Sequence, residues 1–359
     1  RQPSTHPRRC VRAVAADNHH KATGRGPFRS ARDNKTDMIG MRPFLSMTLM
    51  WVCLHWSGIT CADDHMDIAY AEIQPLAPES MLLDVTRVGH RIVAVGERGH
   101  VIYSDDGVDW TQAEHVPTRS TLTTVISVDD RLWAAGHDSV IITSGDGGRN
   151  WSRQFFDPDR QQAVMDLLFT DSDNGVAIGS YGLYLVTSDG GKSWEDRTID
   201  PENDYHLNAM VRFPDGRRFI AGEAGLSYRS GDDGESWELL ELPYQGSMWG
   251  AIEYLDGCIV FFGLRGNMQM SCDSGDNWIE WETGTQASLS GAAVHEGQLV
   301  IAGNSGTVLT RGAGALTAHA HSSGVDFAAV LPMMGGRFLL VGEDGVHLFP
   351  EANGAGDDQ

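Results

Sequence analysis

The chain has 359 residues, a length that allows one large all-β domain or two smaller domains. Glycine is abundant at 42 residues, and the formal net charge is −22. Because so negative a surface repels phosphate groups, the composition excludes nucleic acids as partners, disfavours anionic lipid headgroups and favours solubility.

Residues 1–37 are basic and lack apolar periodicity. Two interpretations stay open for them: a non-globular stretch translated from upstream sequence, or a disordered basic arm of the protein. Without residues 1–62 the chain keeps 17 basic and 46 acidic residues, a formal charge of −29.

Residues 38–62 have the features of a secretory signal peptide. A positive charge at Arg42 precedes a short apolar run, and Thr60-Cys61-Ala62 resembles a cleavage site with small residues. We therefore expect cleavage near Ala62 and export to the periplasm or the extracellular space. A lipid anchor on Cys61 is the alternative, although Thr60 is unfavourable directly before a lipidated cysteine.

A short apolar phrase that ends in glycine recurs seven times after residue 80. Within each unit, short stretches of alternating apolar and polar residues are separated by glycine, aspartate or asparagine, which is typical of strands joined by tight turns. Four-stranded units of this length, repeated seven times, predict an all-β, seven-bladed β-propeller. The repeated glycines lie 39 to 43 residues apart: Gly96, Gly136, Gly179, Gly222, Gly263, Gly303 and Gly342.

Residues 63–350 are therefore assigned to one propeller domain. The last unit contains only three strand-like stretches, whereas residues 68–76 resemble an unpaired fourth strand. We expect residues 68–76 to complete the seventh blade, because closing the ring removes exposed sheet edges. Residues 351–359 are expected to form a disordered tail. The blades are expected at residues 81–119, 120–161, 162–205, 206–246, 247–286, 287–324 and 325–350.

An aspartate five residues before a tryptophan recurs in five units, with a glycine between them. An aspartate in a turn accepts hydrogen bonds from backbone N–H groups, and glycine permits a positive φ. The tryptophan can cover the gap between neighbouring blades. These residues are predicted to be structural: Asp105 and Trp110, Asp146 and Trp151, Asp189 and Trp194, Asp232 and Trp237, and Asp273 and Trp278.

These turns resemble the Asp-box, or BNR repeat, which is structural and lies away from the active centre in the families that contain it. With its seven units and its export signal, the stretch 68–350 resembles the photosystem II stability/assembly factor family and its bacterial relatives. The resemblance implies a monomeric, non-enzymatic binding scaffold that assists a membrane-protein complex. The photosynthetic members use a basic patch, whereas this sequence is acidic and shows no arginine cluster.

The alternative function is that of an Asp-box glycoside hydrolase or a glycan-binding protein. Sialidase-type chemistry needs three clamping arginines and a tyrosine nucleophile with a glutamate partner, a set that the sequence does not show. No G-x-S-x-G, HExxH or Walker motif occurs, so we expect no enzyme activity and no cofactor. His319 and His321 have metal-ligand spacing but lie in a degenerate turn, so no metal site is predicted.

Propellers commonly bind their partners at one end of the central channel. We expect the loops between blades, and the turns between second and third strands, to form this face. Because tyrosine, tryptophan and arginine carry much of the energy of protein interfaces, a protein or peptide partner is predicted. The predicted face comprises Arg119, His137, Asp138, Gln162, Tyr181, His206, Glu223, Trp249 and Arg265.

Cys258 and Cys272 are the cysteines that remain after residue 62. They flank the turn at residues 263–266, so a hairpin would place them opposite each other on adjacent strands. An oxidising compartment would allow a disulfide between them, and two buried thiols are the alternative.

Overall fold

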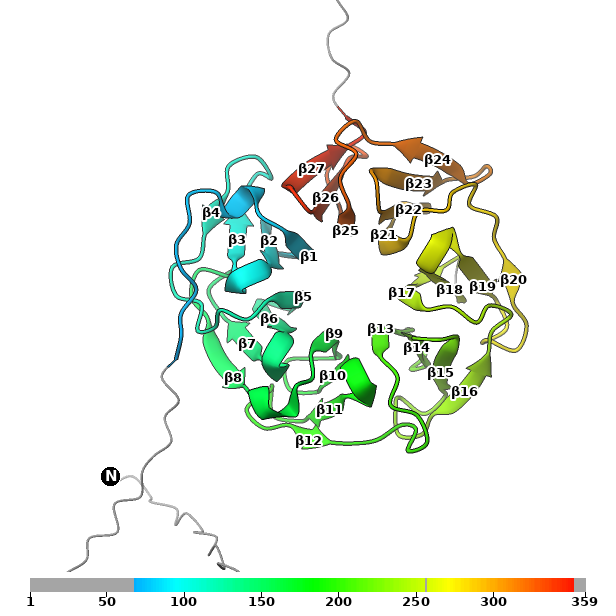
Figure 1. The fold of residues 1–359 in the computed structure, drawn as a ribbon, viewed down its shortest axis with the longest axis horizontal. Coiled ribbons are helices and arrows are strands. Elements are labelled where there is room, and N and C mark those ends of the chain that lie inside the picture. Colours follow the sequence, from blue (N-terminus) through cyan, green and yellow to red (C-terminus); the bar gives the residue numbers. More distant parts are fainter. Residues whose placement is uncertain (1–67, 256, 352–359) are drawn as a thin grey trace, which may run out of the picture. The chain divides into compact units, whose positions relative to one another are not determined.

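The computed structural model describes residues 68–255 and 257–351. Over this part the chain forms 27 strands, six short 3₁₀-helices and seven antiparallel sheets. Figure 1 shows the sheets as blades around a centre, so the prediction of an all-β, seven-bladed propeller is confirmed. The predictions for residues 1–37, for a signal peptide at 38–62 and for the tail after residue 351 lie outside the described residues.

The first three blades consist of β1 (Leu82–Val88), β2 (Arg91–Gly96), β3 (Val101–Ser104) and β4 (Thr111–Gln112); β5 (Leu122–Val128), β6 (Arg131–Gly136), β7 (Ile141–Ser144) and β8 (Ser152–Phe155); and β9 (Val164–Phe169), β10 (Gly175–Gly179), β11 (Tyr184–Thr187) and β12 (Glu195–Asp196). Blades four to six consist of β13 (Leu207–Arg212), β14 (Arg218–Gly222), β15 (Leu226–Ser230) and β16 (Glu238–Glu241); β17 (Met248–Tyr254), β18 (Cys258–Gly263), β19 (Met268–Ser271) and β20 (Ile279–Glu280); and β21 (Leu289–His295), β22 (Gln298–Gly303), β23 (Thr307–Arg311) and β24 (Thr317–Ala320). The seventh blade consists of β25 (Phe327–Pro332), β26 (Phe338–Gly342) and β27 (Gly345–Phe349). The 3₁₀-helices are η1 (Ala77–Glu79), η2 (Glu97–Gly99), η3 (His137–Ser139), η4 (Pro158–Arg160), η5 (Ser180–Gly182) and η6 (Leu264–Gly266).

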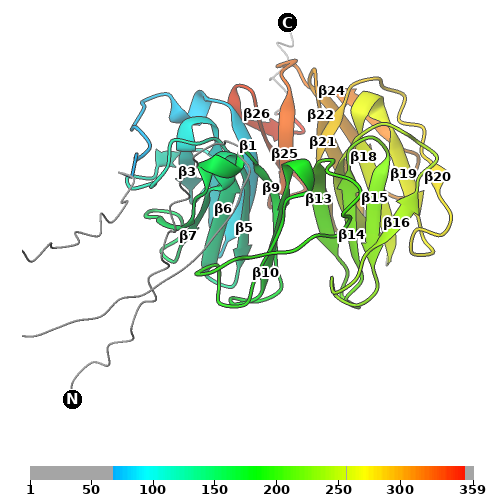
Figure 2. The same ribbon diagram turned by 60° about the horizontal axis from the view of Figure 1, so that its bottom comes forward.

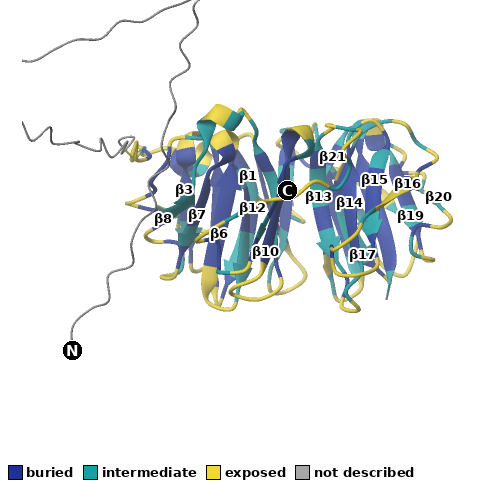
Figure 3. Ribbon diagram, turned by 90° about the horizontal axis from the view of Figure 1, so that it is seen from below, coloured by how far each residue is buried: buried dark blue, intermediate teal, exposed yellow. Residues whose placement is uncertain are grey.

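The first strand of each blade lines the centre of the ring, and the later strands lie farther out (Figure 1). The strands run between two ends of the propeller, where the turns and connections gather (Figure 2). Burial is concentrated along the strands, and exposed residues are concentrated in the turns at both ends (Figure 3). The turns are therefore the part of the fold that is available to a partner.

Aromatic side chains fill the space between neighbouring blades. Trp133 of blade two stacks on Phe169 of blade three with 4.1 Å between ring centroids, and Trp194 meets Phe169 edge-on at 6.0 Å. Trp133 is fully buried. Because these rings come from two blades, their burial joins the blades as well as the strands within each.

The glycine that ends the second strand of each blade is required by a close approach of two backbones. At Gly96 a Cβ atom would overlap the backbone carbonyl oxygen of Met81. The register of β1 against β2 shifts at the same point, between Leu82 and Asp84. The repeat of 39 to 43 residues in the sequence thus marks the same backbone contact in six of the seven blades; at Gly222 of blade four the nearest atom is the carbonyl oxygen of Leu226 instead.

The turn at residues 187–194 closes the β11–β12 hairpin through its own side chains. Thr187 Oγ1 accepts the N–H of Gly191 at 3.0 Å, and Asp189 Oδ1 accepts the N–H of Ser193 at 2.9 Å. The hydrogen bonds from Ser193 lower the pKa of Asp189 to about 2. Since the carboxylate is occupied by donors of its own turn, its role is structural.

In the first blade the prediction of Asp105 as the turn aspartate is wrong. Asp106 takes that place, accepting hydrogen bonds from Ser104 and from two backbone N–H groups of the turn. The turn before Trp110 is one residue shorter than the equivalent turns of blades two to five. The residue five places before Trp110 is therefore Asp105, the neighbour of the aspartate that accepts the hydrogen bonds of the turn. Asp105 instead pairs with Arg91, with 2.7 Å between Oδ1 and Nε.

The prediction that residues 68–76 complete the seventh blade is also wrong. Within the described residues the seventh sheet has three strands, and this N-terminal stretch lies along blade one. The N–H of Ala71 donates to the carbonyl of Val116 at 2.9 Å, and the N–H of Gln74 donates to the side chain of Gln112 at 2.8 Å.

The ring closes through side-chain packing between blades seven and one. β1 packs against β25 and β26, and a buried apolar cluster joins Leu82 and Ile92 of blade one to Leu339 and Val341 of blade seven. The same kind of cluster fills the joint between blades one and two. The last joint therefore resembles the others and needs no strand from the N-terminus.

Cys258 and Cys272 are joined by a disulfide. Cys258 begins β18 and Cys272 follows β19, so the bond crosses two adjacent strands of blade five.

Candidate partner-binding site

One end of the propeller collects the turns between second and third strands and the connections between blades. Four of the predicted residues meet there. Tyr181 lies in η5, His206 directly precedes β13, Glu223 follows β14, and Trp249 is the second residue of β17. Because the first strands of adjacent blades start side by side, residues from different repeats come together at the mouth of the channel.

A cavity of about 280 Å³ opens at this mouth. Its wall combines the second residues of four successive inner strands with side chains from the connections and a turn. Trp249 is 37% exposed although it belongs to a strand. The lining consists of Thr123, Met165, His206, Asn208, Glu223, Ser247 and Trp249.

His206 links the cavity to Tyr181. The two rings meet edge-on with 5.0 Å between their centroids, and Nδ1 of His206 lies 3.7 Å from Oε2 of Glu223. The same Oε2 accepts the backbone N–H of His206 at 3.3 Å. Gln162 fixes the turn by donating to the backbone carbonyl of Tyr181 at 3.1 Å. Tyr181 itself is 58% exposed, so its ring is available beside the cavity.

Of the nine predicted residues, three line the cavity, namely His206, Glu223 and Trp249; Gln162 and Tyr181 lie beside it, and the other four lie farther away. Arg119 pairs with Glu72 of the N-terminal stretch, with 3.1 Å between Nη1 and Oε1. Asp138 accepts a hydrogen bond from a serine of the preceding connection. His137 and Arg265 lie in the equivalent turns of blades two and five. These residues share the end of the propeller with the cavity but lie elsewhere around the ring.

Sequence reasoning missed the cavity residues that come from inner strands and one connection: Thr123, Met165, Asn208 and Ser247. Two of them also tie neighbouring blades. Thr123 Oγ1 donates to the carbonyl of Val164 at 2.6 Å, and Asn208 Nδ2 donates to the carbonyl of Met248 at 2.8 Å. Thr123, Met165 and Asn208 share one position, the register shift at the second residue of the first strand, and this repeated position is the signal that could have identified them.

A groove of about 540 Å³ continues from Tyr181 along the connection between blades three and four. Its wall includes Asp200, Glu202 and Asp204. A separate cavity of about 830 Å³ lies at the opposite end, between blades seven and one, where Met334 is 94% exposed. None of the predicted partner-binding residues lines that second cavity.

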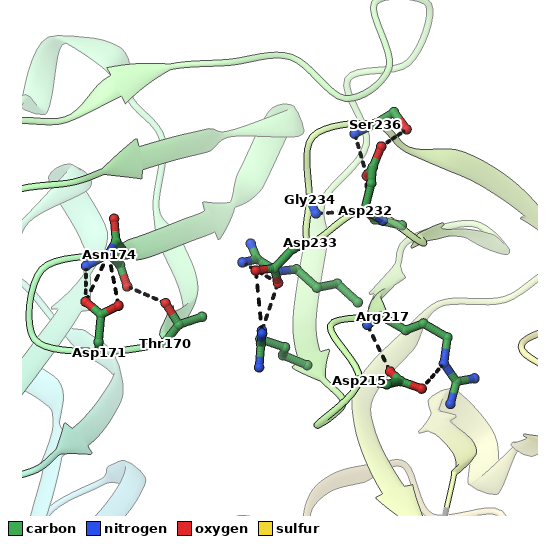
Figure 4. A network of polar contacts seen from close by, with 12 residues as sticks. Thr170, Asp171, Asn174, Asp215, Arg217, Asp232, Asp233, Gly234 and Ser236 are labelled. Carbon is green, nitrogen blue, oxygen red and sulfur yellow. Dashed lines mark hydrogen bonds and ion pairs between the residues drawn. The ribbon is translucent and has the colours of Figure 1, made fainter.

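Arginines gather on blade four at the end opposite the channel mouth, which corrects the expectation of no arginine cluster. Arg212 and Arg218 both pair with Asp233. Arg217 pairs with Asp215 (Figure 4). The two carboxylates therefore compensate most of the positive charge of these three arginines.

The described residues contain no group of three side chains that could hold a metal ion. In the same part of the chain, no helix has the length and apolar character to cross a membrane.

Comparison with known proteins shows which propellers this chain resembles. Residues 154–278 match the family model described as the photosynthesis system II assembly factor YCF48. YCF48 from Cyanidioschyzon merolae is similar, with 18% identity, coverage of 78% of this chain and 97% of that chain, and a TM-score of 0.62. A structure of YCF48 bound to D1 peptide has 18% identity, coverage of 78% and 94%, and a TM-score of 0.63.

The WD40 propeller domain of Doa1 is similar in fold, with 16% identity, coverage of 80% of this chain and 96% of that chain, and a TM-score of 0.62. A search of curated proteins found no match. The resemblance to photosystem II assembly factor-like propellers that the sequence predicts is thus confirmed.

Proposed function

We propose that this protein is a binding scaffold that holds an extended segment of a protein partner at the channel mouth. The observation that carries the proposal is the cavity walled by the partly exposed Trp249 and flanked by the exposed ring of Tyr181. Large aromatic side chains beside a concave surface supply the buried anchors on which peptide affinity depends.

The YCF48 structure with a D1 peptide supports this proposal, since a propeller of the same fold is described there with a peptide ligand. We propose further that the protein is exported, as the sequence of residues 38–62 suggests, and acts on the assembly or stability of a membrane-protein complex in the cell envelope. A formal charge of −29 after removal of residues 1–62 favours solubility in such a compartment.

The cavity gives less support to an enzyme. His206 and Glu223 form a pair that could exchange a proton, but neither a second carboxylate nor an arginine lines the cavity. Glycoside hydrolysis normally needs two carboxyl groups that flank the scissile bond. A glycan-binding role for the two aromatic rings is the competing function that the experiment must separate.

Site-specific photo-crosslinking tests the proposal. A photoreactive phenylalanine analogue replaces Trp249 in one variant and Met334, at the opposite end, in a matched control. In envelope fractions of the source cells we expect the probe at 249 to cross-link one membrane protein repeatedly, and the probe at 334 to yield no such product. The Trp249→Ala variant should bind that protein at least about tenfold more weakly.

Cross-linking from 334 but not from 249 would contradict the proposed site. Capture or turnover of an oligosaccharide, lost in Trp249→Ala, would support the glycan-active alternative instead.

A further inference from the structure

Several polar groups in the wall of the channel-mouth cavity have acceptor atoms that are free to receive a hydrogen bond. Asn208 donates one N–H of Nδ2 to the carbonyl of Met248, and no donor among the described residues reaches its Oδ1, which can therefore accept from a ligand. Thr123 uses its hydroxyl proton on the carbonyl of Val164, so its oxygen can only accept a further hydrogen bond. Ser247 Oγ accepts the N–H of Ala224 and keeps its own proton, so it can accept or donate a further hydrogen bond.

Glu223 adds a negative charge to this wall. Its Oε2 accepts the N–H of His206, and among the described residues no donor reaches Oε1. No lysine or arginine lines the cavity. The only other ionisable group in the lining is His206, whose Nδ1 lies 3.7 Å from Oε2 of Glu223. The cavity therefore combines unused acceptors, a carboxylate and the indole of Trp249.

A ligand group that carries only donors and a positive charge matches this lining. The lysine ammonium and the arginine guanidinium have donors and no acceptor, and both are attracted to the face of an indole ring. We propose that the cavity receives a lysine or arginine side chain of the partner, with its charge beside Glu223 and its aliphatic stem against Met165 and Trp249. This inference rests on the proposed peptide-binding function and specifies the partner's chemistry.

The surface around the cavity favours the same charge. The groove that continues from Tyr181 is lined by Asp200, Glu202 and Asp204, by Asp196, which pairs with Arg160, and by Arg197, the only cation in the lining. An extended segment that leaves the cavity over Tyr181 therefore crosses an acidic surface. Such a surface attracts basic segments and repels acidic ones before contact is made.

Selection from a random linear peptide library tests the inference. The library is selected on the chain of residues 63–359 and counter-selected on its Trp249→Ala variant. We expect enriched peptides to share one lysine or arginine. Replacing that residue by norleucine, which keeps the stem and removes the charge, should weaken binding at least about tenfold.

A matched pair of protein variants tests whether Glu223 is the group that recognises the positive charge of the peptide. Glu223→Gln should lose the same factor of about ten in affinity. Glu343→Gln removes a charge at the same place in the turn of blade seven, outside the cavity, and should leave affinity unchanged. The norleucine substitution changes the peptide and not the protein. A loss of affinity on that substitution therefore cannot come from a folding defect of a protein variant.

The outcomes separate the two proposals. Peptides that depend on Trp249 but share no basic residue, or that bind Glu223→Gln equally well, would overturn this inference and leave peptide binding at the mouth standing. A library that yields no Trp249-dependent peptide would overturn both.

Discussion

Tyr181 holds a left-handed backbone conformation, with φ at 54°, at the second position of the turn between β10 and β11. For a residue other than glycine this conformation costs about 1–2 kcal/mol. The equivalent turns hold it too, at Arg98, Asp138, Ala224, Arg265 and Ser305. The left-handed conformation is therefore a common feature of the repeated turns. The aromatic ring at position 181 distinguishes this turn from the others.

We expect Tyr181→Gly to separate stability from binding. Glycine relieves the left-handed strain but has a larger entropy in the unfolded chain, so the free energy of unfolding should rise by at most ~1 kcal/mol. Loss of the exposed ring beside His206 should weaken partner binding. Urea unfolding and the affinity for the cross-linked partner are measured on the same variant.

Ala224→Gly is the matched control, because Ala224 has the same conformation at φ 55° without an aromatic ring. It should change stability similarly and leave affinity as it is. If Tyr181→Gly bound the partner as tightly as the unaltered chain, Tyr181 would not belong to the binding face.

At the scale of the elements, the closure of the ring shows that the alternation of apolar and polar residues can predict a strand but not the sheet that the strand joins. The apolar alternation of residues 68–76 suggests a strand, but the choice of sheet edge depends on contacts far away in the sequence. In the structure Ala71 bonds to Val116 of the blade-one connection. The joint between blades seven and one depends instead on buried side chains such as Leu339.

Two variants distinguish these contributions. Removing residues 63–74 should lower the free energy of unfolding by about 1 kcal/mol or less, because few of the described residues in this stretch are buried. Leu339→Ala should cost about 2–5 kcal/mol, since it opens a cavity at the closing joint. Denaturant unfolding followed by tryptophan fluorescence measures both. If the truncated chain unfolded without cooperativity, the N-terminal stretch would be needed to close the ring, and closure by side-chain packing alone would be contradicted.

At the scale of the whole molecule, the sequence predicts the repeated contacts better than the unique ones. Each repeated glycine meets a backbone of its own blade, so a period in the sequence is enough to predict the fold. The period also places Arg119 and Tyr181 at the same end of the strands. It does not tell which blades face the cavity, so Arg119 was included and Asn208 was missed. That distinction depends on packing across the ring.

Two carboxyl groups in the channel wall join blades to one another. Asp84 accepts the N–H of Val125 from the next blade at 2.7 Å, and Asp166 accepts the N–H of Met210 at 2.7 Å. Burial raises the pKa of Asp84 to about 6 and that of Asp166 to about 7, against the opposing effect of these hydrogen bonds. The Thr124 side chain also opposes the rise in pKa at both carboxyls.

These shifts predict a stability maximum in mildly acidic solution. A raised pKa means that the folded chain favours the protonated carboxyl, so the contribution of Asp84 and Asp166 is present below about pH 4 and is lost as the pH rises through 6 and 7. The turn aspartates have the opposite sign: hydrogen bonds from their own turns lower the pKa to about 2, so their contribution is lost as the pH falls from about 4 toward 2. The turn carboxyls concerned are Asp189, Asp232 and Asp273.

We therefore expect the urea midpoint to be highest near pH 4 and to fall between about pH 4 and pH 7. In the double variant Asp84→Asn, Asp166→Asn the fall above pH 4 should disappear, because neither of these two carboxyls is left to ionise. Asp138→Asn, at an exposed turn, should keep the slope of the unaltered chain. If the double variant also kept that slope, the pH dependence would arise from groups other than the two carboxyls that join the inner strands.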